Sequence, residues 1–189
     1  MAAVKIAVFA SGSGSNFQAI QEAILRGELD ASVELVVTDK PGAYVVTRAS
    51  GFNIPVLELA PKAFESKADY EQAIVGELKE RGIEWVVLAG YMRLVGDVLL
   101  AAYENRIINI HPSLLPSFPG KDAIGQAFAH GVKVTGVTVH YVDAGMDTGP
   151  IIAQAAVDVV EGDLAATEAR IHEVEHVLYT NTLKHLFEK

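Results

Sequence analysis

The sequence predicts a doubly wound α/β fold, with a mostly parallel sheet of about seven strands and a Rossmann-like N-terminal half. Short apolar runs alternate with segments of helical periodicity along the chain, and such alternation is typical of parallel strands joined by right-handed crossover helices. A Gly-rich turn, residues 11–16, follows the first apolar run. No linker, repeat or low-complexity tract interrupts the sequence, so residues 1–189 are expected to form a single domain.

In the first half, about residues 1–100, the expected strands are apolar runs rich in β-branched residues. They cover residues 4–10, 33–38, 54–57 and 85–89. Helices are expected between them, where apolar residues recur every three or four positions. They cover residues 17–25, 43–50 and 66–81. Gly51 and Gly82 are expected to end the second and third helices, because glycine adopts the left-handed conformation of a helix C-cap.

The second half, about residues 101–189, follows a short helix at 97–103 and begins with a strand at 107–110 and a Pro-rich turn. The same periodicity arguments predict a helix at 122–129, which Gly131 ends, and two strands with high β-propensity. Those strands cover residues 134–141 and 151–159, and a long helix covers 164–187.

Composition excludes several classes of protein. The 189 residues are 50% hydrophobic, contain no cysteine and carry a formal net charge of −9. Disulfides, thiolate catalysis and cysteine-bound zinc are therefore excluded, and the acidic balance argues against broad nucleic-acid binding. No apolar stretch approaches the length of a membrane span and no signal-peptide pattern precedes the first strand. We expect a cytoplasmic protein with no membrane partner.

The Gly-rich turn predicts an anion site. Gly12 and Gly14 permit positive φ, and either Ser15 or Asn16 is expected to cap the following helix. Free backbone N–H groups and the helix dipole could then hold a phosphate. A dinucleotide fingerprint would need glycine where this chain has Phe17, and a P-loop would need a lysine in the turn. A phosphate on a small metabolite fits better, although strand-turn-helix junctions need glycine in any case.

Asn109 and His111 are the most informative pair. Both lie in the 107–110 strand or at its end, and the two-residue period of a strand places them on one face. Pro112 cannot extend the strand, so His111 is expected at the edge where α/β sheets bind ligands. The alternative is a capped strand end with a hydrogen-bonded histidine.

Asp147 is the candidate acid. It lies in a Gly-rich loop after the 134–141 strand, and beside His111 it could orient the ring, raise its pKa and stabilise the imidazolium. The alternative is an aspartate that only hydrogen-bonds its own turn. Strand periodicity does not decide whether His140 lies in the core or in a cleft.

One metal motif needs consideration. His172, Glu173 and His176 match the His-Glu-x-x-His pattern of zinc proteases on a helix. Few residues follow His176 to supply a third ligand, and a chance match is plausible among 6 histidines. We therefore expect no metal site.

Three segments together resemble one family. Residues 10–16, the Asn-Ile-His-Pro-Ser-Leu-Leu-Pro motif at 109–116, and the segment from His140 to Pro150 are similar to the glycinamide ribonucleotide formyltransferases of purine biosynthesis. The resemblance runs from about residue 4 to 179. The motif at 109–116 is specific for folate-dependent formyl transfer, and the first motif indicates the glycinamide ribonucleotide branch.

The resemblance implies 10-formyltetrahydrofolate as the formyl donor and the amine of glycinamide ribonucleotide as the acceptor, with no metal. By position it implies Asn109, His111 and Asp147 as catalytic residues. The implied acceptor-binding residues are Gly14, Ser15, Asn16 and Glu175. The implied folate-binding residues are Lys67, Met92, Arg93, Leu94, Val95, Asn109, Asp143, Ala144, Gly145, Met146 and Asp147.

One implied folate contact differs from the family pattern, because Lys67 stands where some members have arginine and so lacks the planar fork. The first half of the chain would hold the phosphate, and the second half would carry catalysis and folate binding. The sequence leaves a homodimer open. It also leaves open a sugar-nucleotide or other folate-dependent formyltransferase, and a non-enzymatic nucleotide-binding module.

Overall fold

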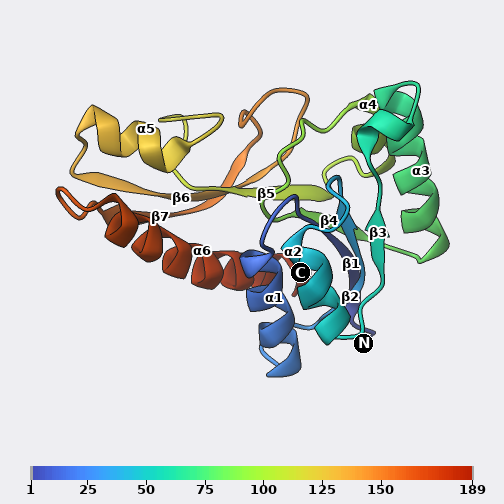
Figure 1. Ribbon diagram of the computed structural model, residues 1–189. Coiled ribbons are helices and arrows are strands. Elements are labelled where there is room, and N and C mark those ends of the chain that lie inside the picture. Colours follow the sequence, from blue (N-terminus) through green and yellow to red (C-terminus); the bar gives the residue numbers. More distant parts are fainter. Residues whose placement is uncertain (1, 189) are drawn as a thin grey trace.

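The computed structural model describes residues 2–188 and contains a seven-stranded sheet with the order β3-β2-β1-β4-β5-β6-β7 (Figure 1). The strands are β1 (Val4–Phe9), β2 (Ala31–Thr38), β3 (Val56–Glu58), β4 (Trp85–Leu88), β5 (Ile107–His111), β6 (Val134–Tyr141) and β7 (Ile151–Asp158). The first five strands are parallel, whereas β6 runs antiparallel to both β5 and β7. The predicted fold class, a mostly parallel α/β sheet, is confirmed.

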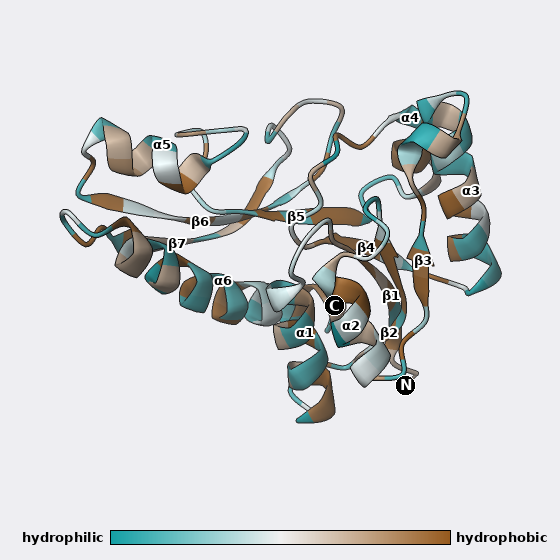
Figure 2. Ribbon diagram, in the orientation of Figure 1, coloured by the Kyte–Doolittle hydropathy of each residue, from teal (hydrophilic) through white to brown (hydrophobic). Residues whose placement is uncertain are grey.

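The central strands are apolar at successive positions because helices cover both faces of the sheet. In β1, Ile6 and Val8 pack into one buried cluster, while Ala7 and Phe9 pack into the other. Figure 2 shows this pattern as brown strands at the centre, surrounded by helices that carry both brown and teal segments. The sequence signal for strands here was therefore a continuous apolar run rather than an alternating one.

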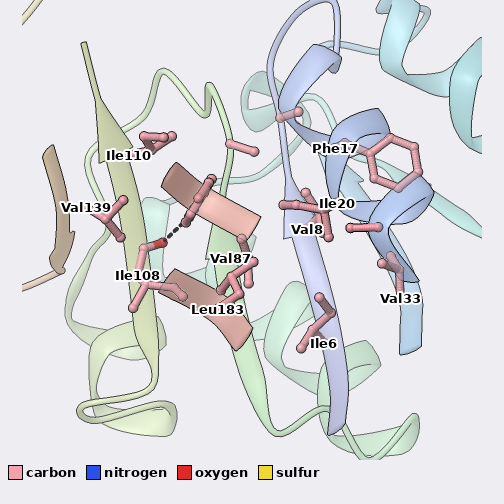
Figure 3. Packing of buried hydrophobic residues seen from close by; sticks show 14 of the residues in the cluster. Ile6, Val8, Phe17, Ile20, Val33, Val87, Ile108, Ile110, Val139 and Leu183 are labelled. Atoms are coloured by element: carbon pink, nitrogen blue, oxygen red, sulfur yellow. Dashed lines mark hydrogen bonds between the residues drawn. The ribbon is translucent and has the colours of Figure 1, made fainter. Parts of the chain in front are cut away.

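Two groups of helices form the covering layers. The helices are α1 (Ser15–Leu25), α2 (Tyr44–Gly51), α3 (Lys67–Glu80), α4 (Asp97–Ala102), α5 (Ala123–His130) and α6 (Leu164–Phe187), with a short 3-10 turn, η1 (Pro61–Ala63). Buried residues of α1, α2 and α6 share one cluster, and those of α3 and α4 share the other. Figure 3 shows Phe17 and Ile20 of α1 and Leu183 of α6 close to Val8 and Val87 of the sheet.

The predicted element boundaries differ from the structure mainly around β3. Residue 51 belongs to α2, and the strand begins at Val56 rather than at Ile54. The reason is local: the N–H of Ile54 donates to Ala49 O (3.0 Å) and so completes the helix end. Pro55 then separates this turn from the strand. By contrast, α6 has the predicted bounds, and Gly131 (φ 82°) ends α5 as expected.

The carboxyl ends of β1, β4 and β5 lie at one edge of the sheet because these strands are neighbours and parallel. Ligands bind at this edge in open α/β sheets. The antiparallel β6 has a further effect, since its register places His140 directly opposite Asn109. Among residues 2–188, no helix has the length and apolar character needed to cross a membrane.

One buried hydroxyl group links α6 to the strands beneath this edge. Tyr179 is fully buried, and its hydroxyl lies 2.7 Å from Leu88 O and 3.2 Å from Ile108 O. Its single O–H is thus shared between the backbones of β4 and β5. Burial raises the pKa of Tyr179 well above its ordinary value, so the phenol stays neutral and can donate.

We predict that Tyr179→Phe lowers the free energy of unfolding by about 1–2 kcal/mol, because a buried donor is lost while its acceptors remain. Urea unfolding measures this difference. Tyr44→Phe is the matched control, since Tyr44 is 58% exposed, and it should change stability by less than about 0.5 kcal/mol. Equal stability of both variants and the original protein would contradict a structural role for this hydroxyl.

Candidate functional site

A cavity of about 470 Å³ opens at the carboxyl edge of the sheet. Its walls come from the turn after β1, the segment after β4, the end of β5, the start of α5, the loop between β6 and β7, and one face of α6. Most of the predicted site residues line it. They are Gly14, Ser15, Asn16, Met92, Arg93, Leu94, Val95, Asn109, His111, Asp143, Gly145, Met146, Asp147 and Glu175.

Two predicted folate contacts lie elsewhere. Lys67 and Ala144 line a neighbouring hollow of about 330 Å³, which shares Leu94 and Val95 with the main cavity. A ligand confined to the main cavity would therefore not meet Lys67. Only a ligand that extends past Leu94 and Val95 would meet it.

The Gly-rich turn forms one end of the cavity. Gly14 has φ 77°, and a Cβ built there would lie 2.5 Å from Val45 Cγ2, so both backbone conformation and space require glycine. The prediction that Ser15 or Asn16 caps α1 is wrong: Gly14 is the N-cap, and within the described chain no side chain caps this helix. The missing cap leaves the first-turn N–H groups to a ligand.

One further observation supports an anion site at this turn, and a second indicates a place for a hydrogen-bond donor beside it. Arg48 of α2 donates from Nε to Ser13 O (2.7 Å), which brings a positive charge beside the turn of an acidic protein. Asn16 Oδ1 is buried, and among residues 2–188 it has no hydrogen-bond partner. A buried acceptor without a partner is uncommon unless a ligand or water donates to it, so this oxygen suits a donor group of a ligand rather than the anion itself.

Asn109 is held by the histidine opposite it. His140 Nδ1 lies 2.8 Å from Tyr141 O, and because a carbonyl only accepts, this nitrogen carries the proton. Burial lowers the pKa of His140, which favours the neutral ring. Its Nε2 then accepts from Asn109 Nδ2 at 3.4 Å. This bond fixes the orientation of the Asn109 amide and leaves its second N–H for a ligand.

His111 faces an oxygen atom at each ring nitrogen. Nε2 lies 2.9 Å from Phe118 O, and Nδ1 lies 3.6 Å from Asp147 Oδ2. The second distance is that of an ion pair rather than of a direct hydrogen bond. A carbonyl oxygen only accepts, so His111 donates from Nε2 to Phe118 O while Nδ1 faces the carboxylate of Asp147. The predicted meeting of His111 and Asp147 is present in the structure.

Asp147 is presented by a tightly folded loop. Its own φ is 55°, a conformation uncommon outside glycine, and its Oδ2 accepts from Gly120 N at 2.8 Å. A Cβ at Gly149 would lie 1.7 Å from Tyr141 O, so the loop returns to β6 with no space for a side chain. Asp147 Oδ1 also lies 3.9 Å from His140 Nε2, so the carboxylate of Asp147 faces both His111 and His140.

Part of the cavity wall is apolar and exposed. Met92 is 63% exposed, Met146 is 59% exposed and Leu94 is 47% exposed. Large apolar side chains exposed together at a cavity are a mark of a binding surface. Residues after β4 and residues of the β6–β7 loop could thus hold a flat aromatic ligand between them.

The helix α6 brings a carboxylate to the cavity. Glu175 is buried, and its Oε2 lies 2.8 Å from His172 Nδ1. The hydrogen bond that His172 donates to Glu175 raises the pKa of His172. Of the residues in the His-Glu-x-x-His match, His172 thus forms an ion pair with Glu175, which lies outside the motif's defining positions. In the part of the chain that the structure describes, no group of three or more suitable side chains is placed to hold a metal ion.

Sequence reasoning missed three residues around the cavity. His140 was undecided, because its position depends on the β5–β6 register. Arg48 gave no local signal, since it supports a turn 35 residues away. His172 was weighed only as a metal ligand. Its position three residues before Glu175 could have suggested an ion pair between the two side chains on one face of the helix.

Comparison with known proteins agrees with the geometry. A family model described as formyl transferase matches residues 4–183. The phosphoribosylglycinamide formyltransferase of Bacillus subtilis (strain 168) is 57% identical over 183 residues, covering 96% of this chain and 94% of that protein. The crystal structure of glycinamide ribonucleotide transformylase 1 from Geobacillus kaustophilus is 59% identical, with a TM-score of 0.95 and coverage of 98% and 99%. That of phosphoribosylglycinamide formyltransferase from Bacillus halodurans is 57% identical, with a TM-score of 0.95 and coverage of 98% and 96%.

We predict that Glu175→Gln lowers the pKa of His172, because the hydrogen bond to the carboxylate favours the imidazolium. The pair stabilises the fold fully below pH 6.5, the ordinary value for histidine, and this contribution is lost as the pH rises through the raised pKa. NMR titration of the ring protons measures the shift. Glu173→Gln is the control, since Glu173 is exposed on the same helix. An identical His172 titration in both variants would refute the pairing.

Proposed function

Because this chain belongs to the formyl transferase family, we propose that it transfers a formyl group from 10-formyltetrahydrofolate to the primary amine of glycinamide ribonucleotide in purine biosynthesis. One observation carries the proposal. An amide, an imidazole and a carboxylate from Asn109, His111 and Asp147 meet in a single cavity, which also contains an uncapped Gly-rich helix start. A nucleotide-binding module would need the helix start but not the three side chains.

The acceptor is bound at the Gly-rich turn. Its phosphate accepts from the first-turn N–H groups of α1, at Gly14, Ser15 and Asn16, where the helix dipole favours an anion. Glu175 on α6 then accepts hydrogen bonds from the ribosyl hydroxyls or the glycinamide group. This arrangement is supported by the missing cap on α1 and by the position of Glu175 in the same cavity.

The folate is bound along the apolar wall. Met92, Arg93, Leu94 and Val95 line the pteridine pocket, and residues 143–147 close on the ring. Lys67 contacts the donor only where its tail extends into the neighbouring hollow, which Lys67 and Ala144 line. The first half of the chain therefore supplies the phosphate site and part of the folate wall, whereas the second half supplies the reacting groups and Glu175.

The reaction begins when the acceptor amine attacks the formyl carbon and negative charge develops on the formyl oxygen. The free N–H of Asn109 and the protonated His111 donate to this oxygen, and such preorganised donors stabilise an oxyanion strongly. The new bond joins the amine nitrogen to the formyl carbon, and the bond from that carbon to the folate nitrogen breaks. The amine loses a proton, and the folate nitrogen gains one.

Asp147 supports both stages. Its carboxylate lies 3.6 Å from His111 Nδ1 and so stabilises the imidazolium through charge. It can also accept the amine proton, directly or through one water. His111 Nε2 is bonded to Phe118 O in the structure, and this nitrogen is released when the ring turns toward the formyl oxygen. Neither a metal nor a covalent enzyme intermediate has a part in these steps.

An absorbance assay that follows tetrahydrofolate formation tests the proposal directly. Turnover with 10-formyltetrahydrofolate and glycinamide ribonucleotide is the expected result. Turnover only with an amino-sugar nucleotide would show that the acceptor is a sugar nucleotide and that the reaction is still formyl transfer. No turnover with either, despite nucleotide binding, would favour a binding module. We expect this reaction in the cytoplasm, and sedimentation analysis would determine whether the protein forms a homodimer.

We predict that His111→Ala and Asp147→Asn each lower kcat by about 10²-fold or more, by analogy with the loss of an oxyanion-hole donor. Steady-state kinetics with both substrates saturating measures the effect. His185→Ala is the control, because His185 is exposed in the last turn of α6. A folded variant of His111 or Asp147 with near-native kcat would remove that residue from the mechanism.

A further inference from the structure

A buried carboxylate lies behind the cavity and takes no part in the steps above. Asp39 follows β2 and is 8% exposed, and its Oδ1 accepts from the hydroxyl of Ser11 at 2.5 Å. Ser11 stands between β1 and the Gly-rich turn. Neither residue lines the main cavity as the described residues define it, so neither would touch a substrate there.

Ser11 is bonded on its other side to the segment after β4. Its N–H donates to Gly90 O at 2.9 Å, and its Oγ accepts from the N–H of Met92 at 2.8 Å. One side chain thus connects the start of the Gly-rich turn to the start of the apolar wall. Asp39 is the third member of this chain of hydrogen bonds.

The chemistry of a hydroxyl group explains why Asp39 matters. A serine hydroxyl has one proton and two lone pairs, and it rotates to suit its neighbours. A carboxylate accepts that proton strongly, so a lone pair of Ser11 stays directed at the N–H of Met92. Without Asp39 the hydroxyl can rotate and donate elsewhere, and the bond to Met92 loses its fixed geometry.

The segment after β4 is also contacted by Tyr70 of α3. Tyr91 Oη lies 2.9 Å from Tyr70 Oη, and burial, followed by this hydrogen bond, raises the pKa of Tyr91. The guanidinium of Arg93 lies 5.3 Å from the centre of the Tyr70 ring. Tyr91 and Arg93 are therefore fixed by α3, whereas the backbone of Met92 between them depends on Ser11.

We propose that Asp39 is a positioning residue for the folate: through Ser11 it fixes the backbone of Met92 and so the shape of the wall formed by residues 92–95. This inference rests on the proposed function only for the identity of the ligand. An ordinary hydrogen bond at a strand end would contribute to stability alone. The positioning role predicts instead that loss of Asp39 weakens binding of the folate and not of glycinamide ribonucleotide.

The test compares Asp39→Ala, Asp39→Asn and Ser11→Ala in the full chain. Asp39→Ala should raise KM for 10-formyltetrahydrofolate about tenfold, equivalent to about 1.4 kcal/mol. It should leave KM for glycinamide ribonucleotide and kcat within about twofold, since the reacting groups are not moved. Asp39→Asn keeps an acceptor oxygen and should recover most of the affinity. Ser11→Ala should match Asp39→Ala, and the double variant should be no worse than either, as expected for one connected unit.

The protein contains a matched control for these variants. Ser32 donates to Glu34 Oε1 at 2.7 Å at the other end of β2, so Ser32→Ala and Glu34→Ala remove the same kind of bond far from the cavity. Both should leave the two KM values unchanged. If Asp39→Ala changes neither KM, or raises both equally with a fall in kcat, the positioning role is wrong. If Asp39→Ala does not fold, Asp39→Asn and Ser11→Ala decide the same question.

Calorimetric titration with tetrahydrofolate, the expected product, separates failure of this inference from failure of the proposed function. Loss of affinity in Asp39→Ala supports the positioning role even if glycinamide ribonucleotide proves not to be the acceptor. Equal affinity in Asp39→Ala and in the original protein overturns it even if formyl transfer is confirmed.

Discussion

The pairing of β5 with the antiparallel strand β6 determines the arrangement of the proposed reacting groups. Because β6 runs against β5, His140 lies opposite Asn109, and the loop that leaves β6 returns across the cavity. That loop contains Asp147, which reaches both His111 and His140.

The cavity depends on two kinds of rigidity. The strands are fixed by burial on both faces, and Tyr179 connects the backbones of β4 and β5 from the helix layer. The loops are fixed by local hydrogen bonds instead: Thr148 donates to Asp143 Oδ1 at 2.6 Å, and the N–H of Gly145 donates to the same oxygen at 3.0 Å. These bonds lower the pKa of Asp143, that from Thr148 having the larger effect. A site built this way keeps its polar groups in place while its apolar wall stays open.

Much of this organisation could be predicted from the sequence, because strand and helix periods are local properties. The bounds of α6 and the shared face of Asn109 and His111 follow directly from those periods. The contact between His111 and Asp147 could not be predicted this way, since it depends on a strand pairing 27 or more residues apart in the chain. The prediction that Ser15 or Asn16 caps α1 was wrong for a related reason. Ser15 and Asn16 are good capping residues, but Val45 of another helix packs against Gly14 and determines the backbone there.

The uncapped start of α1 has a consequence for stability. If the proposed phosphate binds at the start of α1, it supplies hydrogen-bond acceptors that a capping side chain would otherwise supply, and the protein without ligand lacks those bonds. A substitution that supplied them would make the empty protein more robust and would compete with the ligand for the same donors. Under the proposed function, phosphate binding requires these N–H groups to stay uncapped, at the cost of the stability that a capping side chain would add.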